Sequence, residues 1–237
     1  MAGRGASAPT ATSERLVDMR HPGSSPRSVG PALRAPHASP QPNQRNRQLP
    51  MIDPQRAALI PIDVQRGFDY PPWGPRNNPQ MEANGQRLLH AWRARGLPLI
   101  HVRHDSVIDA STLHPSHPGH AFRPGFEPLA GETVIGKSVN AAFIGTDLDL
   151  RLRRRGIDTI VLFGISTDMC VSTTARVASN LGYRTLVIAD ACFCFDLVDA
   201  DGSVIAADAV SRAHLATLRA EFAEVMNVDD IVAMIAA

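Results

Sequence analysis

Three side chains suited to covalent catalysis, Asp63, Lys137 and Cys170, each follow a short apolar run in the sequence. A thiol can attack a carbonyl carbon, a carboxylate can take and return the thiol proton, and an ammonium can stabilise both anions. Cys170 follows a strand pattern and a glycine turn and opens a helix pattern, where the helix dipole favours a thiolate. A lone cysteine is more often a small buried apolar residue, but this position favours a nucleophile.

The segments that must position these residues alternate between strand and helix patterns. Predicted strands cover residues 57–63, 97–102, 159–163, 185–189 and 224–226, with a further short apolar stretch before Lys137. Predicted helices cover residues 81–95, 148–155, 169–181, 206–222 and 229–235. Apolar runs without polar alternation are typical of strands buried on both faces. The pattern predicts a three-layer α/β fold, with a mostly parallel sheet of about six strands and helices on both faces. Ligands bind such folds at the carboxyl ends of the strands.

The composition argues against several functional classes. The chain of 237 residues has a formal net charge of +1, so we expect no nucleic-acid partner. No apolar run reaches the roughly 18 residues that a membrane-spanning helix needs, so we expect no membrane partner. The cysteines are Cys170, Cys192 and Cys194, and this low, odd count favours a reducing cytoplasm over a disulfide framework.

The first 50 residues differ from the rest of the chain. They are rich in Pro, Ser, Arg and Gln and have almost no aliphatic clustering. Such a segment buries too little apolar surface to offset its ordering entropy. We therefore predict a disordered tail over residues 1–50 and a single folded domain over residues 51–237.

The order and spacing of the motifs resemble one known family, the isochorismatase-like cysteine hydrolases, which include nicotinamidases and N-carbamoylsarcosine amidases. The resemblance is carried by residues 62–65 (IDVQ), 137–143 (KSVNAAF), 145–148 (GTDL) and 164–171 (GISTDMCV). It covers about residues 55–236, and implies that residues 51–237 form one isochorismatase-like, Rossmann-like hydrolase domain.

The resemblance implies a catalytic triad of Asp63, Lys137 and Cys170, which hydrolyses a small non-peptide amide through a cysteine acyl-thioester. Asp63 would take the thiol proton and return it to the leaving amine, while Lys137 holds the charges in place. A cis peptide bond is implied between Ile165 and Ser166, with the N–H groups of Ser166 and Cys170 as oxyanion donors. No cofactor is implied. The family is also expected to form a homo-oligomer, a dimer or tetramer, with the apolar C-terminal helix as a contact.

Six residues in and near these motifs are candidates for substrate binding: Gln65, Phe68, Trp73, Asn140, Phe143 and Thr167. Aromatic side chains on the Pro-rich loop after the first strand could pack on a flat substrate, and anchoring of the loop is an equal alternative. These motifs do not distinguish nicotinamide, carbamoyl compounds, maleamate-like acids and cyclic amides as substrates.

Three alternative functions stay open. Isochorismatase itself cleaves a vinyl ether, but members with that activity lack the nucleophilic cysteine, so Cys170 favours an amidase. A metal-dependent hydrolase is suggested by His114, His117 and His120. The Asp-x-His spacing of such enzymes is absent, however, and Pro and Gly mark an irregular loop, so we expect no metal. A non-catalytic binding or scaffold module on the same fold would not need the complete triad.

Overall fold

A single parallel sheet organises the domain. The computed structural model describes residues 51–236, so the disorder expected of residues 1–50 lies outside the described residues. Its sheet has six strands in the order β3-β2-β1-β4-β5-β8, and every neighbouring pair is parallel. The strands are β1 (Ala57–Ile62), β2 (Ile100–His104), β3 (Thr133–Lys137), β4 (Thr159–Ile165), β5 (Arg184–Phe193) and β8 (Glu224–Met226). The predicted parallel sheet is confirmed.

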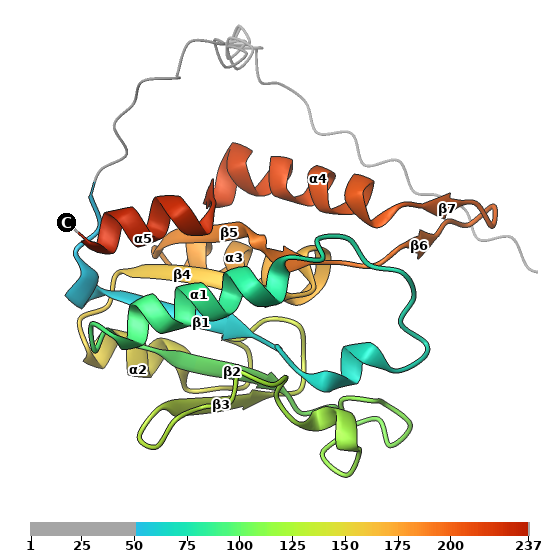
Figure 1. The fold of residues 1–237 in the computed structure, drawn as a ribbon, viewed down its shortest axis with the longest axis horizontal. Coiled ribbons are helices and arrows are strands. Elements are labelled where there is room, and N and C mark those ends of the chain that lie inside the picture. The colour runs from blue at the N-terminus through green and yellow to red at the C-terminus, as the bar shows by residue number, and fades with distance from the viewer. Residues whose placement is uncertain (1–50, 237) are drawn as a thin grey trace, which may run out of the picture. The chain divides into compact units, whose positions relative to one another are not determined.

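Helices cover both faces of this sheet. The α-helices are α1 (Met81–Arg93), α2 (Leu148–Arg154), α3 (Ser172–Asn180), α4 (Ala207–Thr217) and α5 (Val228–Ala236). Figure 1 shows α1 and α5 in front of the sheet and α2 and α3 behind it. All residues of β1 and β4 are buried, as expected of central strands whose apolar runs face a helix layer on each side. Among residues 51–236, no helix combines the length and apolarity required to cross a membrane.

Two of the predicted helices are interrupted. The helix expected over residues 169–181 begins as a π-helical segment, η4 (Thr167–Val171), in which Val171 N–H donates to Ser166 O at 3.1 Å. Likewise, α4 ends in a second π-helical segment, η5 (Leu218–Phe222). Single π turns inside helices occur frequently at functional sites, because they turn side chains away from the regular helical spacing.

Several short elements were not predicted. They are the 3₁₀ turns η1 (Pro54–Arg56), η2 (Arg66–Asp69) and η3 (Pro118–His120), and a hairpin of β6 (Leu197–Val198) and β7 (Val204–Ile205). β5 also runs beyond its predicted end at residue 189 to Phe193, because the β4–β5 pairing resumes at Gly164 and Cys192 after a shift of register.

The connections define a switch point in the sheet. From β1 the chain crosses through α1 to β2, whereas from β4 it crosses through α3 to β5 on the opposite side. The strands β1 and β4 are neighbours, so their carboxyl ends flank the crevice where such folds bind ligands.

Candidate active site

Asp63, Lys137 and Cys170 converge at the carboxyl edge of the sheet. Asp63 directly follows β1, where its N–H donates to Val102 O at 2.9 Å and its φ of 50° turns the chain. Aspartate tolerates this left-handed conformation better than most residues. Lys137 is the last residue of β3, and Cys170 lies in η4 just after β4. Three separate strands therefore deliver the three side chains to one buried place.

The Lys137 ammonium is the centre of this cluster. Its Nζ lies 2.6 Å from Asp63 Oδ2, with both side chains wholly buried, and 3.4 Å from Cys170 Sγ. It also lies 3.0 Å from His104 Nδ1. Lysine has three N–H donors and no acceptor, so these three contacts occupy all of them. Asp63 Oδ2 is held by the ion pair with Lys137, whereas Oδ1 has no hydrogen-bond partner among residues 51–236, which leaves Oδ1 free to take a proton.

Burial sets the electrostatics of the cluster. Loss of solvent raises the pKa of Asp63 above its ordinary value, although the neighbouring Lys137 acts in the opposite direction. Burial, and then the nearby Asp63 carboxylate, raise the pKa of the Cys170 thiol, although Lys137 opposes this as well. The surroundings of Cys170 therefore favour the neutral thiol over the thiolate that was expected from a helix N-terminus.

His104 is a member of the cluster that the sequence analysis did not identify as functional. It ends β2 and pairs in register with Lys137 on β3. Burial and the adjacent ammonium lower the pKa of His104 to about 4, so the imidazole is neutral and accepts from Lys137. Its place two residues after the strand predicted over 97–102 was the one signal available, because the register between β2 and β3 cannot be read from the sequence.

The turn before Cys170 is tightly enclosed. The Ile165–Ser166 peptide bond, at the position implied by the resemblance, is cis. Ser166 and Thr167 are both buried, and Thr167 Oγ1 has no hydrogen-bond partner among residues 51–236. Thr167, three residues before Cys170 in η4, therefore has a hydroxyl free to donate and accept a hydrogen bond.

Gln65, expected to bind substrate, is fully occupied by the backbone. Its Nε2 donates to His104 O at 3.1 Å and to His120 O at 2.9 Å. Its Oε1 accepts the His104 N–H at 2.8 Å. Both amide donors and the acceptor are used, so we assign Gln65 to holding His104 in place rather than to contacting substrate.

An aromatic cluster follows β1. The Phe68 ring lies 4.9 Å from that of Trp73, and Trp73 lies 5.0 Å from Phe195 between their ring centroids. Trp73 also donates through Nε1 to Thr112 Oγ1 at 3.3 Å, which fixes the indole. Trp73 is partly exposed, so these rings both anchor the loop and present an apolar surface on the carboxyl side of β1.

The two remaining substrate candidates separate. Asn140 is exposed, and its Oδ1 lies 3.8 Å from Cys170 Sγ, within contact of the nucleophile. The Phe143 ring instead stacks on Tyr183, with 5.7 Å between centroids, past the opposite end of α3 from Cys170. Phe143 therefore packs on the core, and we no longer assign it to the substrate site.

The loop histidines do not share a site. His114 Nδ1 lies 2.8 Å from Ser116 Oγ, His117 Nδ1 accepts the Gly119 N–H at 2.9 Å, and His120 Nε2 lies 2.7 Å from Asp105 Oδ1. The metal-binding atom types that do approach one another, within 4.8 Å, belong to Asp63, His104 and Cys170. The Lys137 ammonium contacts all three of these side chains, so a cation already occupies the space between them.

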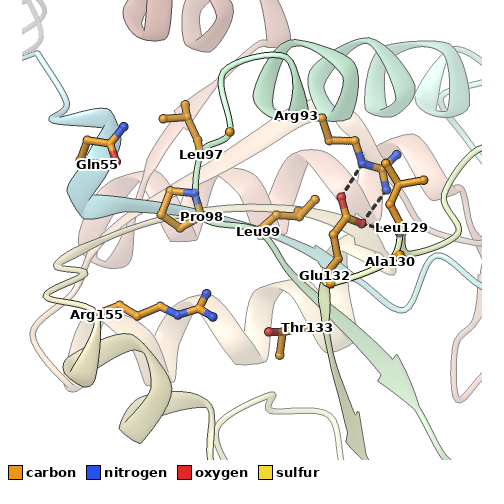
Figure 2. Close-up of a pocket in the computed structure, with 12 residues that line it drawn as sticks. Gln55, Arg93, Leu97, Pro98, Leu99, Leu129, Ala130, Glu132, Thr133 and Arg155 are labelled. Atoms are coloured by element: carbon orange, nitrogen blue, oxygen red, sulfur yellow. Dashed lines mark hydrogen bonds and ion pairs between the residues drawn. The ribbon is translucent and has the colours of Figure 1, made fainter.

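A surface hollow of about 700 Å³ lies at the other end of the sheet. Its lining includes residues just before β2 and at the start of β3, together with Arg155, as Figure 2 shows. Glu132 in its wall is held by Arg93, with both contacts at 2.8 Å, and by His101 Nε2 at 2.8 Å. The hollow opens at the amino ends of the strands, whereas the candidate nucleophile is at their carboxyl ends, so we place the chemistry at the buried cluster.

Comparisons with known proteins agree with the fold. Residues 57–230 match the isochorismatase domain family. YrdC, an uncharacterized isochorismatase family protein of Bacillus subtilis, is 38% identical over 178 residues, covering 75% of this chain and 95% of YrdC. A crystal structure of an isochorismatase family protein from Chromobacterium violaceum superimposes with a TM-score of 0.76 at 47% identity, covering 78% of this chain and 96% of the other.

Relatives with a named activity include amidohydrolases. The ureidoacrylate amidohydrolase RutB of Methylobacterium radiotolerans is 27% identical over 180 residues, covering 59% of this chain and 68% of RutB. The maleamate amidohydrolase of Pseudomonas putida is 41% identical over a shorter stretch of 68 residues, 29% of this chain and 32% of that enzyme. The domain match spans most of residues 51–236, and the parallel sheet agrees with it. The chain therefore belongs to the isochorismatase family of hydrolases.

Proposed function

We propose that this protein hydrolyses the C–N bond of a small non-peptide amide, with Cys170 as the nucleophile and an acyl-thioester as the intermediate. The observation that carries the proposal is the position of the Lys137 ammonium, 2.6 Å from Asp63 Oδ2 and 3.4 Å from Cys170 Sγ. A base, a cation and a thiol in mutual contact are the groups that acyl transfer to sulfur requires.

In the acylation step, the Asp63 carboxylate takes the Cys170 proton as the sulfur attacks the amide carbonyl carbon. The raised pKa of the thiol favours this transfer to a base, because burial disfavours the free thiolate. The raised pKa of Asp63 makes it a stronger base than an exposed carboxylate. When the tetrahedral intermediate collapses, the C–N bond breaks and Asp63 returns the proton to the leaving nitrogen.

In the deacylation step, water replaces the released amine. Asp63 takes a proton from this water as its oxygen attacks the thioester carbonyl, and the C–S bond then breaks. The departing sulfur recovers a proton from Asp63, so the acid product leaves and the starting thiol and carboxylate are restored. Lys137 keeps one positive charge beside whichever of the two groups is negative.

The remaining groups fit substrate recognition. The N–H groups of Ser166 and Cys170 are the proposed donors to the oxyanion. Asn140, whose Oδ1 lies 3.8 Å from Cys170 Sγ, and Thr167, whose buried hydroxyl has no partner among the described residues, would orient the amide. The Phe68–Trp73 pair would bound a flat or apolar part of the substrate.

The alternatives are a vinyl-ether hydrolase and a non-catalytic module. A vinyl-ether reaction does not need a nucleophilic sulfur, and a scaffold has no use for a carboxylate and a thiol buried around one ammonium. Burying these charged groups is costly, which favours a catalytic role for them.

A screen of small amides tests the proposal, with ammonia release measured for the open-chain amides, and ring opening of cyclic amides or cleavage of a vinyl ether followed by mass spectrometry. The panel should hold nicotinamide, N-carbamoyl compounds, maleamate, ureidoacrylate and cyclic amides, with a vinyl-ether substrate as the competing class. We expect turnover of at least one amide by the wild type, none by Cys170→Ser, and an acyl adduct on Cys170 by mass spectrometry. Cleavage of the vinyl ether alone, or amide turnover that survives Cys170→Ser, would reject the cysteine mechanism.

We further propose a cytoplasmic homo-oligomer, a dimer or tetramer. The C-terminal helix expected as a contact has Ile231 and Ile235 buried in its own core, so its apolar face is used within the chain. Exposed apolar side chains lie instead outside the main sheet and its helices, on the loops that hold Val107, Ile108, Val139 and Ile144 and on the β6–β7 hairpin with Val198 and Val204. Light scattering at micromolar concentration should give a multiple of the 25.5 kDa chain mass, and a monomer would contradict it.

A further inference from the structure

His104 provides a ring nitrogen as a hydrogen-bond acceptor for the Lys137 ammonium. Its Nδ1 is 3.0 Å from Lys137 Nζ, which is shorter than the 3.4 Å contact between Nζ and Cys170 Sγ. An ammonium with three donors needs three acceptors to have one fixed orientation. Asp63 and Cys170 supply two, and His104 supplies the third.

The imidazole can only serve as an acceptor when it is neutral. Burial and the positive charge of Lys137 lower the pKa of His104 to about 4, which keeps the ring neutral at physiological pH. Nδ1 then accepts the Lys137 N–H, and the ring proton resides on Nε2.

The backbone around His104 is held on both sides. Gln65 bonds both the N–H and the C=O of His104, at 2.8 and 3.1 Å. The next residue, Asp105, donates its N–H to Lys137 O at 2.7 Å, which continues the pairing of β2 with β3. A side chain at Gly136 would collide with the Asp105 carboxylate, so the glycine allows this close approach. The backbone that carries the imidazole is therefore fixed beside Lys137.

We infer that His104 is a positioning residue, which directs the Lys137 ammonium toward Asp63 and Cys170 through its Nδ1 acceptor. Without it, one ammonium donor would be unsatisfied in a buried site, and Lys137 would turn away from the thiol to find another acceptor. The catalytic part of this inference rests on the proposed amide hydrolysis, whereas the placement of His104 does not.

The first test compares two substitutions of similar size. His104→Asn retains an acceptor near the position of Nδ1, whereas His104→Leu has none. We expect His104→Leu to lower kcat about 10- to 100-fold with little change in KM, since the lost bond involves a charged group. His104→Asn should recover most of kcat, and His114→Leu, on the outer loop, should match the wild type. Equal kcat values for His104→Leu and the wild type, or equal losses for Leu and Asn, would overturn the inference.

The second test needs no substrate and uses Zn²⁺ as a probe. Lys137→Ala removes the ammonium and leaves one oxygen, one nitrogen and one sulfur atom within 4.8 Å of one another, a set that zinc binds well. Titration against a chromogenic chelator should show one zinc per Lys137→Ala chain, and binding at least about tenfold weaker for Lys137→Ala with His104→Leu. Equal zinc affinity of the two variants would show that His104 does not face this space and would overturn the inference.

The two tests fail in different ways. If the amide proposal is wrong, no amide is turned over, yet zinc binding still reports where His104 points. If Lys137→Ala does not fold, the role of His104 is tested by comparing His104→Leu with His104→Asn. The two measurements are amide turnover and the rate at which iodoacetamide alkylates Cys170. An alkylation rate that is the same in wild type, His104→Leu and His104→Asn would overturn the inference, because a displaced ammonium must alter the environment of the sulfur.

Discussion

Lys137 Nζ lies 2.6 Å from Asp63 Oδ2, and neither side chain is exposed to solvent. Taking two charges out of water costs several kcal/mol for each ion, and their attraction offsets this only while both partners are present. The pair therefore adds little to the stability of the fold, yet loss of either partner alone would leave an unpaired buried charge. In the proposed mechanism its value is chemical, because it keeps a carboxylate base and a cation beside the Cys170 thiol.

The first prediction concerns this pair. Asp63→Asn should abolish turnover, because an amide cannot take the thiol proton, and should lower the free energy of unfolding by about 3–5 kcal/mol through the unpaired ammonium. The double variant Asp63→Asn with Lys137→Met should recover most of the stability and none of the activity. Urea denaturation measures the first quantity and ammonia release the second.

An exposed ion pair provides the control for that experiment. Arg151 of α2 and Asp147, the residue before that helix, lie 2.8 Å apart, with nearly half of each side chain exposed. Asp147→Asn should change stability little, because solvent screens such pairs. A loss of stability in Asp63→Asn no larger than that in Asp147→Asn would contradict the buried-pair account.

The second prediction is the acidic limb of the pH profile. Asp63 must be ionised to act as a base, and burial raises its pKa above the ordinary value of about 3.9. As the pH falls through this raised pKa, the carboxylate is protonated and kcat/KM should decline at a higher pH than for an exposed aspartate. The profile of kcat/KM against pH measures the midpoint.

His104 could contribute to the same limb, because its pKa is lowered to about 4 and its protonation would place a second cation beside Lys137. His104→Asn removes that titration and preserves the acceptor. If Asp63 is responsible, kcat/KM of this variant should still decline at acidic pH. Loss of that decline would show that protonation of His104 causes it.

The third prediction concerns Gly164, which stands between β1 and the nucleophile turn. Its φ is +133°, and a Cβ atom there would collide with the carbonyl oxygen of Ile62. Gly164→Ala should therefore cost about 2–4 kcal/mol of unfolding free energy, from strain and from separation of β1 and β4. Gly74→Ala, where a Cβ meets open space, should change stability by less than about 0.5 kcal/mol. Equal melting temperatures of Gly164→Ala and Gly74→Ala would contradict this prediction.

The fold was predictable where burial alone determines it. Strands such as β1 and β4 are buried along their whole length, so their sequences are continuous apolar runs that no other element explains as well. The π-helical segments were not predictable, because a single i→i+5 bond such as that from Val171 N–H to Ser166 O leaves no periodic signal. The full length of β5 depends on its pairing with Gly164, which is a tertiary contact.

The candidate site likewise contains residues that could be predicted from the sequence and residues that could not. Asp63, Lys137 and Cys170 follow apolar runs, and the carboxyl ends of parallel strands lie at one edge, so their convergence could be anticipated. His104 depends on the register of β2 against β3, which hydrophobic patterns do not specify. Gln65 was a candidate for substrate binding because it lies in the motif that contains Asp63, whereas its actual partners are backbone groups of His104 and His120.

The last prediction separates the nucleophile from the other cysteines. All three are buried and unpaired, so burial does not distinguish Cys170 from Cys192 or Cys194. The difference lies in their surroundings, because only the Cys170 sulfur among these contacts Lys137, while Cys194 Sγ lies 3.1 Å from Ala207 O. Cys170→Ser should eliminate turnover and leave the melting temperature nearly unchanged, since a serine hydroxyl fits the space and is a far weaker nucleophile.

The matched controls follow from the same contacts. Cys194→Ser can still donate to Ala207 O, and Cys192→Ala removes only a buried sulfur, so both should retain kcat within about threefold, although Cys192→Ala should lose about 1 kcal/mol of stability. Steady-state kinetics and thermal melts of the three variants provide the comparison. If Cys192→Ala abolished turnover while still folded, or if Cys170→Ser retained it, the sulfur beside Lys137 would not be the nucleophile, and the acyl-thioester route would have to be abandoned.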